Sequence, residues 1–170
     1  MVLVIMGVVG SGKTTVGTLL AHKLGWQFAD ADDFHPGENI AKIRRGTALT
    51  DADRAPWLAA MRDAIQRWEK EGKDFVLACS ALKHSYREEL RAGEVQFVYL
   101  KGEARLIAER LHARRGHFAT DSILESQFAD LEEPKDALAV SIAETPEAIT
   151  SEIIDRLKLA RVSYPDAAQK

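Results

Sequence analysis

Residues 7–14 read Gly-Val-Val-Gly-Ser-Gly-Lys-Thr and fit the pattern G-x-x-x-x-G-K-[S/T] at every fixed position. The apolar run before this stretch, residues 2–6, is typical of a short strand that is buried on both faces. After it, residues 15–24 carry apolar side chains at spacings of three and four, which indicates a helix. Strand, loop and helix in this order form the context in which the pattern binds phosphate. A glycine-rich turn with an ordinary lysine is the alternative, and the agreement of pattern and context argues against it.

The residue types in this stretch suit a polyphosphate ligand. Glycine lets backbone N–H groups approach the phosphates and tolerates positive φ angles, and the N-terminus of a helix favours anions. Lys13 brings a cation to the outer phosphates, and the Thr14 hydroxyl can hold Mg²⁺. The predicted nucleotide-binding residues of the loop are Gly7, Val8, Val9, Gly10, Ser11, Gly12, Lys13, Thr14 and Thr15.

Length and composition favour one soluble domain that covers residues 1–170. A net charge of −3 offers no broad basic surface for nucleic acid, so any anion site must be local. Cys79 is the single cysteine, which excludes an intramolecular disulfide and a cysteine-based zinc site. The apolar run at the N-terminus is too short for a signal peptide or a membrane span. We therefore expect a cytoplasmic protein without a nucleic-acid or membrane partner.

Strand and helix patterns alternate along the rest of the chain. Further strands are predicted at 26–29, 75–79, 95–100 and 139–142. Further helices are predicted at 36–45, from 50 or 51 to about 71, on the segment that carries Lys83 and Arg87, at 103–115, at 121–131 and at 146–160. This alternation predicts a parallel sheet with helices on both faces and right-handed crossovers. The predicted helix that ends near residue 71 carries one apolar stripe, which we assign to the core. The stripe consists of Trp57, Leu58, Met61, Ile65 and Trp68.

Three acidic residues, Asp30, Asp32 and Asp33, follow the second predicted strand. Burying them together without a cation would be costly. One carboxylate could hold Mg²⁺ through water, and another could accept the proton of an attacking hydroxyl. A solvated acidic turn that caps the next helix is the alternative. The position one strand–helix unit after the phosphate loop favours the chemical role.

Two groups of basic residues are candidates for binding anions. Lys83 and Arg87 lie four apart on the helix expected after the third strand, project to one side of it and suit an acidic substrate, although a surface face neutralised by Glu88 and Glu89 is an alternative. A later helix is rich in arginine and is followed by Gly116 and a short helix, which suggests a closing lid over about 114–131. The favourable interaction of arginines with the negative end of the helix dipole is the alternative, and it would explain only one or two of them.

The chain resembles the gluconokinase family, which is related to the shikimate and nucleoside monophosphate kinases. The resemblance runs from Val4 to about Pro134. Besides residues 7–14, it rests on Asp32-Asp33-Phe34-His35-Pro36, Asn39-Ile40, Leu49-Thr50-Asp51, Asp53-Arg54, Pro56-Trp57-Leu58, Cys79-Ser80-Ala81-Leu82-Lys83, Tyr86-Arg87, His117-Phe118, Ser126-Gln127-Phe128 and Leu131-Glu132. The family usually has Asp-Gly-Asp where this chain has Asp30-Ala31-Asp32, and alanine there requires a backbone without a strongly positive φ.

This resemblance implies ATP-dependent phosphorylation of D-gluconate on its 6-hydroxyl, a P-loop NTPase fold with five parallel strands in the order 2-3-1-4-5, a lid and a homodimer. Lys13 and Asp32 are the candidate catalytic residues, and Thr14 and Asp30 the candidate Mg²⁺ site. Lys83 and Arg87 are candidates for the gluconate carboxylate. Residues expected at the acceptor hydroxyls or at the closure of the pocket are Asp32, His35, Arg54, Ser80, His117 and Gln127. Arg110, Arg114 and Arg115 are expected on the lid and nucleotide side.

Two other functions fit the phosphate loop. A shikimate or nucleoside monophosphate kinase would use the same loop with a different acceptor. A non-enzymatic nucleotide switch is less compatible, because the chain has no Asn-Lys-x-Asp guanine motif and its third strand lacks a terminal aspartate.

Overall fold

The computed structural model describes residues 1–115 and 119–161, with the side chains of residues 114–115 and 119–121 excepted. Its centre is one five-stranded sheet in the order β2-β3-β1-β4-β5, and all its strand pairs are parallel. The strands are β1 (Val2–Met6), β2 (Gln27–Asp30), β3 (Phe75–Ala78), β4 (Val95–Lys101) and β5 (Leu138–Ser141). The parallel sheet and the strand order implied by the resemblance are both confirmed.

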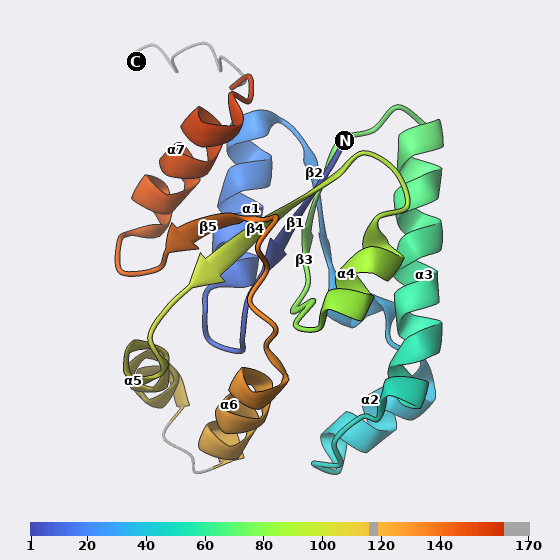
Figure 1. The fold of residues 1–170 in the computed structure, drawn as a ribbon, viewed down its shortest axis with the longest axis vertical. Helices are drawn as coiled ribbons and strands as arrows, with labels where there is room; N and C mark the ends of the chain where they lie inside the picture. The colour runs from blue at the N-terminus through green and yellow to red at the C-terminus, as the bar shows by residue number, and fades with distance from the viewer. Residues whose placement is uncertain (116–118, 162–170) are drawn as a thin grey trace, which may run out of the picture.

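Helices cover both faces of this sheet (Figure 1). The α-helices are α1 (Lys13–Leu24), α2 (Gly37–Arg44), α3 (Asp51–Lys70), α4 (His84–Leu90), α5 (Ala104–Arg115), α6 (Ala119–Asp130) and α7 (Pro146–Leu157). A short 3-10 helix, η1 (Ala31–Phe34), follows β2 and was not predicted. The predicted end of the last helix at residue 160 is wrong, because Lys158 adopts a left-handed conformation with φ 54° and ends α7 at Leu157.

The side-chain alternation of β1 explains why the core has two halves. Leu3 and Ile5 are fully buried in the cluster that includes α1 and α7. Val4 and Met6 are fully buried in the cluster that includes α3 and α4. Because successive side chains of a strand point to opposite faces, a continuously apolar strand needs a helical layer on each side. The five apolar residues before the phosphate loop therefore place that loop at the centre of the molecule.

Helix α3 has both a clear start and a buried face. Thr50 and Asp53 form a capping box, in which each side chain accepts from the backbone N–H of the other residue. Met61 and Ile65, one turn apart, are both fully buried against the sheet. The apolar stripe predicted for this helix is therefore part of the core.

We expect Met61→Ala to lower the free energy of unfolding by about 2–5 kcal/mol, because it opens a cavity beneath the sheet. Ala60→Ser, on the exposed face of the same helix, should change it by less than about 0.5 kcal/mol. Urea unfolding followed by circular dichroism measures both. Equal stability of the two variants would contradict the packing of α3 described above.

The carboxyl ends of the strands meet at one edge of the sheet, where ligands of parallel α/β proteins bind. The phosphate loop follows β1, the acidic segment begins at the last residue of β2, and Cys79 and Ser80 follow β3. Helices α2 and α6 lie beyond this edge (Figure 1). None of the described helices is long and apolar enough to cross a membrane.

Candidate active site

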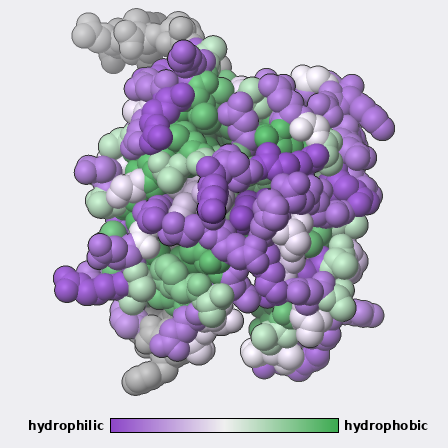
Figure 2. Space-filling view, viewed as in Figure 1, coloured by the Kyte–Doolittle hydropathy of each residue, from purple (hydrophilic) through white to green (hydrophobic). Residues whose placement is uncertain are grey.

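A cavity of about 600 Å³ opens at this edge of the sheet. The phosphate loop and the acidic segment line it, together with the β3–α4 loop, the α2–α3 loop and α6. Figure 2 shows its mouth as a notch between α6 and α2. Segments far apart in the chain therefore share one space, which is large enough for a nucleotide phosphate chain and a small acceptor.

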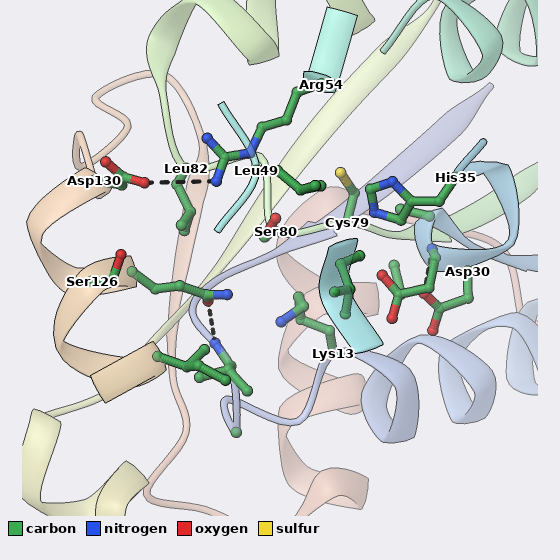
Figure 3. Close-up of a pocket in the computed structure, with 18 of the residues that line it drawn as sticks. Lys13, Asp30, His35, Leu49, Arg54, Cys79, Ser80, Leu82, Ser126 and Asp130 are labelled. Atoms are coloured by element: carbon green, nitrogen blue, oxygen red, sulfur yellow. Dashed lines mark hydrogen bonds and ion pairs between the residues drawn. The ribbon is translucent and has the colours of Figure 1, made fainter. Parts of the chain in front are cut away.

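The phosphate loop adopts backbone angles that its glycines permit. Gly10 and Gly12 have φ angles of 79° and 95°, in the left-handed region. Gly12 also precedes the first turn of α1, where Val16 N–H donates to its carbonyl oxygen. The Lys13 ammonium lies 3.0 Å from the carbonyl oxygen of Val8 and points across the loop (Figure 3). Partial desolvation lowers the pKa of Lys13, although nearby acidic groups oppose this shift.

The acidic segment is connected directly to the phosphate loop. The Thr14 hydroxyl donates to Asp30 Oδ2 at 3.0 Å, and the Asp32 backbone N–H donates to Asp30 Oδ1 at 3.1 Å. Desolvation by the surrounding protein, followed by the negative charge of Asp30, raises the pKa of Asp32. The third acid, Asp33, does not line the cavity. The structure thus brings Thr14, Asp30 and Asp32 together, as the sequence predicted.

Alanine fits where the family usually has glycine. Ala31 is not among the described residues with positive φ, so its side chain causes no backbone strain. It is buried, and its carbonyl oxygen accepts from Trp57 Nε1 at 2.7 Å. Residue 31 therefore has a backbone without a strongly positive φ, which is the condition for alanine at this position.

His35 lies on the same side of the cavity as Asp30 (Figure 3). Its ring stacks on Trp57 with centroids 4.7 Å apart and planes 7° apart. Desolvation lowers the pKa of His35, so the imidazole is neutral at pH 7. Trp57 was assigned to the core alone, and this is incomplete: it is buried and also lines the cavity.

Arg54 supplies positive charge to the end of the cavity away from the phosphate loop. Among the described residues, Lys13 and Arg54 are the lysine and arginine side chains that line the cavity. Arg54 Nη1 donates to the Tyr86 hydroxyl at 3.0 Å, and Nη2 lies 4.0 Å from an Asp130 carboxylate oxygen (Figure 3). Arg54 projects from the first turn of α3, whose capping box fixes the direction of that turn.

Arg87 does not occupy the position that the spacing suggested. It is 3% exposed, and its Nη1 donates to the carbonyl oxygens of Ala81 and Leu82 at 3.0 and 2.9 Å. These contacts hold the β3–α4 loop, in which Ala81 has a φ of 43°. Arg87 therefore does not line the cavity. The alternative, a surface face neutralised by Glu88 and Glu89, is also wrong for Arg87, because its side chain is buried.

Lys83 does not line the cavity either. It precedes α4 as its N-cap residue in an extended conformation, so Lys83 and Arg87 do not share one helix face. The Lys83 ammonium lies 2.8 and 3.0 Å from the two carboxylate oxygens of Asp51. The expected pair of cations is thus absent from the described lining of the cavity, and Arg54 lies there instead.

The remaining candidates have mixed outcomes. Ser80 and Gln127 line the cavity, and Gln127 Oε1 accepts from the Val9 backbone N–H at 2.6 Å, which joins α6 to the phosphate loop. Arg110 does not line it, and its guanidinium donates to the carbonyl oxygen of Ile142 at 2.7 Å. His117 and the side chains of Arg114 and Arg115 lie outside the described part of the chain, so the expected lid is only partly described.

Several residues that line the cavity had no role assigned from the sequence. They include Ile43, Thr47, Ala48, Leu49, Cys79, Leu82, Tyr86, Ser122, Ile123, Ser126 and Asp130. Burial raises the pKa of the Cys79 thiol to about 12, so it is protonated at neutral pH. The sequence blocks of the family resemblance contain Leu49, Cys79, Leu82, Tyr86 and Ser126. These blocks were the available signal for those five residues, but they do not show which residues come together in space.

Comparison with known proteins agrees with this architecture. A family model described as shikimate kinase matches residues 9–158. A gluconokinase from Gluconobacter oxydans is 47% identical over 157 residues, which cover 89% of this chain and 88% of that protein. A probable gluconokinase from Mus musculus and a gluconokinase from Escherichia coli are each 42% identical, and a gluconokinase from Arabidopsis thaliana is 39% identical.

Solved structures give the same result. A sugar kinase from a Janibacter species is 41% identical, with a TM-score of 0.85 and coverage of 94% of this chain and 95% of that chain. A gluconokinase from Sinorhizobium meliloti is 38% identical, with a TM-score of 0.80 and coverage of 92% and 94%. The chain therefore belongs to the gluconokinase family, a group of phosphate-loop kinases with the shikimate kinase fold.

Proposed function

We propose that this protein transfers the γ-phosphoryl group of ATP to the 6-hydroxyl of D-gluconate and yields ADP and 6-phosphogluconate. The observation that carries the proposal is one cavity that joins the phosphate loop to Asp32 and Arg54. Relatives named gluconokinase, with up to 47% identity over most of the chain, support the choice of acceptor.

The phosphate loop and Asp32 would divide the chemistry between them. The loop N–H groups and Lys13 hold the outer phosphates and offset the charge of the transferring group. The acceptor oxygen forms a bond to the γ-phosphorus while the bond from that phosphorus to the β–γ bridging oxygen breaks. The hydroxyl proton passes to Asp32, whose raised pKa makes it a better proton acceptor than an ordinary aspartate.

We extend the proposal to Mg²⁺ at Thr14 and Asp30. A hydroxyl and a carboxylate oxygen 3.0 Å apart beside a phosphate loop are hard oxygen donors of the kind that Mg²⁺ prefers. When bound with ATP, the ion would neutralise charge on the phosphate oxygens. Thr14 and Asp30 already contact each other, so little reorganisation is needed to hold it.

The far end of the cavity suits a polyhydroxy acid. The Arg54 guanidinium matches a carboxylate by charge and by its paired donors. Asp130, Ser80 and the neutral His35 ring line the same space and can exchange hydrogen bonds with hydroxyl groups.

We also propose a homodimer, on the family resemblance. We propose that the protein works in the cytoplasm, because its single cysteine, Cys79, is a free, buried thiol that fits a reducing compartment.

The test is ADP formation from Mg·ATP with D-gluconate, shikimate, AMP or no acceptor. We expect rapid ADP formation only with gluconate, and 6-phosphogluconate in equal amount. ATP binding without any stimulation by gluconate would retain the phosphate-loop kinase family and overturn the choice of acceptor. ADP formation that is fast without any acceptor would contradict a kinase.

A further inference from the structure

Two carboxylates lie close enough to Arg54 to neutralise its charge. Asp51 Oδ1 lies 3.4 Å from its Nη1, and Asp130 Oδ2 lies 4.0 Å from its Nη2. An arginine that forms a full ion pair with a protein carboxylate is a poor site for a second, incoming carboxylate. The availability of Arg54 for an acidic acceptor therefore depends on what else these two carboxylates contact.

Asp51 has closer partners than Arg54. The Lys83 ammonium contacts both of its oxygens at 2.8 and 3.0 Å, and the Tyr86 hydroxyl donates to Oδ1. These two hydrogen bonds, with that from Lys83 the larger effect, lower the pKa of Asp51 to about 2. Asp51 is thus ionised over the working range of pH, and its charge is matched by Lys83.

Tyr86 connects this pair to the cavity. Its hydroxyl donates its single hydrogen to Asp51 and accepts from Arg54 Nη1 at 3.0 Å. Its ring, 8% exposed, lies 5.6 Å from the Lys83 ammonium and 5.8 Å from the Arg54 guanidinium carbon. Arg54 Nη1 therefore lies closer to the Tyr86 hydroxyl, at 3.0 Å, than to Asp51 Oδ1, at 3.4 Å.

We propose that Lys83 promotes acceptor binding without touching the acceptor: by pairing with both oxygens of Asp51, it keeps the contact between Asp51 and Arg54 long and weak, and Tyr86 fixes the guanidinium for an incoming carboxylate. Lys83, Asp51 and Tyr86 are then positioning residues, and Arg54 is the residue that contacts the acceptor. The inference rests on the proposed function, since it concerns how the same cavity takes a carboxylate. It reverses the direct role that sequence spacing suggested for Lys83.

A double-mutant cycle separates an indirect role from a direct one. Lys83→Met removes the ammonium and keeps most of the stem, which leaves Asp51 with Arg54 as its nearest cation. We expect the KM for gluconate to rise about tenfold, while kcat and the KM for ATP change by less than about threefold. Adding Asp51→Asn should return the KM for gluconate to within about threefold of the wild type, because residue 51 then carries no charge that competes for Arg54, while Asp130 is the same in every variant.

Two further variants complete the experiment. Tyr86→Phe keeps the ring and removes the hydroxyl, and we expect it to raise the KM for gluconate about fivefold or more, again with little change in the KM for ATP. Lys73→Met is the matched control: it also removes a lysine that pairs with an acid, Glu71 at 2.7 Å, but at the other end of α3. It should leave every constant unchanged.

The outcomes are distinct. If the wild type makes no ADP with gluconate, the proposed function fails and takes this inference with it. If the wild type is active but the double variant binds gluconate as poorly as Lys83→Met, then Lys83 contacts the acceptor directly and the inference alone is overturned. Rescue by Asp51→Asn, with unchanged thermal unfolding in all variants, supports the indirect role.

Discussion

Lys13→Ala is expected to lower kcat by about 10³-fold or more, because it removes the cation that faces the transferring phosphoryl group. The loss should appear in kcat rather than in the KM for gluconate, since Lys13 and Arg54 lie apart in the cavity (Figure 3). Steady-state kinetics with the coupled ADP assay measures the effect. The same preparation should bind ATP more weakly in a calorimetric titration.

The fold should tolerate this change. In the structure, the Lys13 ammonium donates to the carbonyl oxygen of Val8. When the side chain is shortened to alanine, water can replace the ammonium at this oxygen. The melting temperature should therefore stay within a few degrees of that of the wild type. Turnover near the wild-type rate in a folded Lys13→Ala protein would refute the role of the phosphate loop.

Asp32→Asn should be the second most damaging substitution, with a loss in kcat of about 10²–10⁴-fold. The amide keeps the shape of the side chain but cannot accept the acceptor's proton. ATP binding should be nearly unchanged, because the phosphate loop and the contact between Thr14 and Asp30 remain intact. Normal turnover together with normal ATP binding would remove Asp32 from the mechanism.

The pH profile gives an independent check on Asp32. Its pKa is raised by desolvation and by the Asp30 carboxylate, and the working form of a base is the ionised one. The rate of the wild type should therefore fall as pH falls through this raised pKa, at a higher pH than for an ordinary aspartate. In Asp32→Asn, the remaining rate should lose this acidic limb.

The same shift fixes the sign of the stability effect. The folded protein holds the Asp32 proton more tightly than the unfolded chain does, so this group favours folding below its unfolded pKa. That contribution is lost as pH rises through the folded pKa. At pH 7, Asp32→Asn should accordingly be as stable as the wild type or slightly more stable, which thermal unfolding can measure.

Local patterns in the sequence determined the elements and their order. The apolar runs of 2–6 and 75–79 predicted buried strands, and both are central in the sheet. The glycines and the lysine of residues 7–14 predicted the phosphate loop. These predictions succeeded because strand burial and loop conformation depend on neighbouring residues. The acidic segment after β2 was also located correctly, since parallel strands bring their carboxyl ends to one edge.

Only the tertiary structure decided which cations line the cavity. Spacing placed Lys83 and Arg87 on one helix face, but α4 begins at His84, and Arg87 turns back to the carbonyl oxygens of its own loop. Lys83 instead pairs with Asp51, which lies 32 residues away in the chain. The free energy of a buried or paired charge depends on partners from other elements, and no local pattern contains them. The sequence alone therefore determined the phosphate end of the site, while packing between α3, α4 and α6 determined the acceptor end.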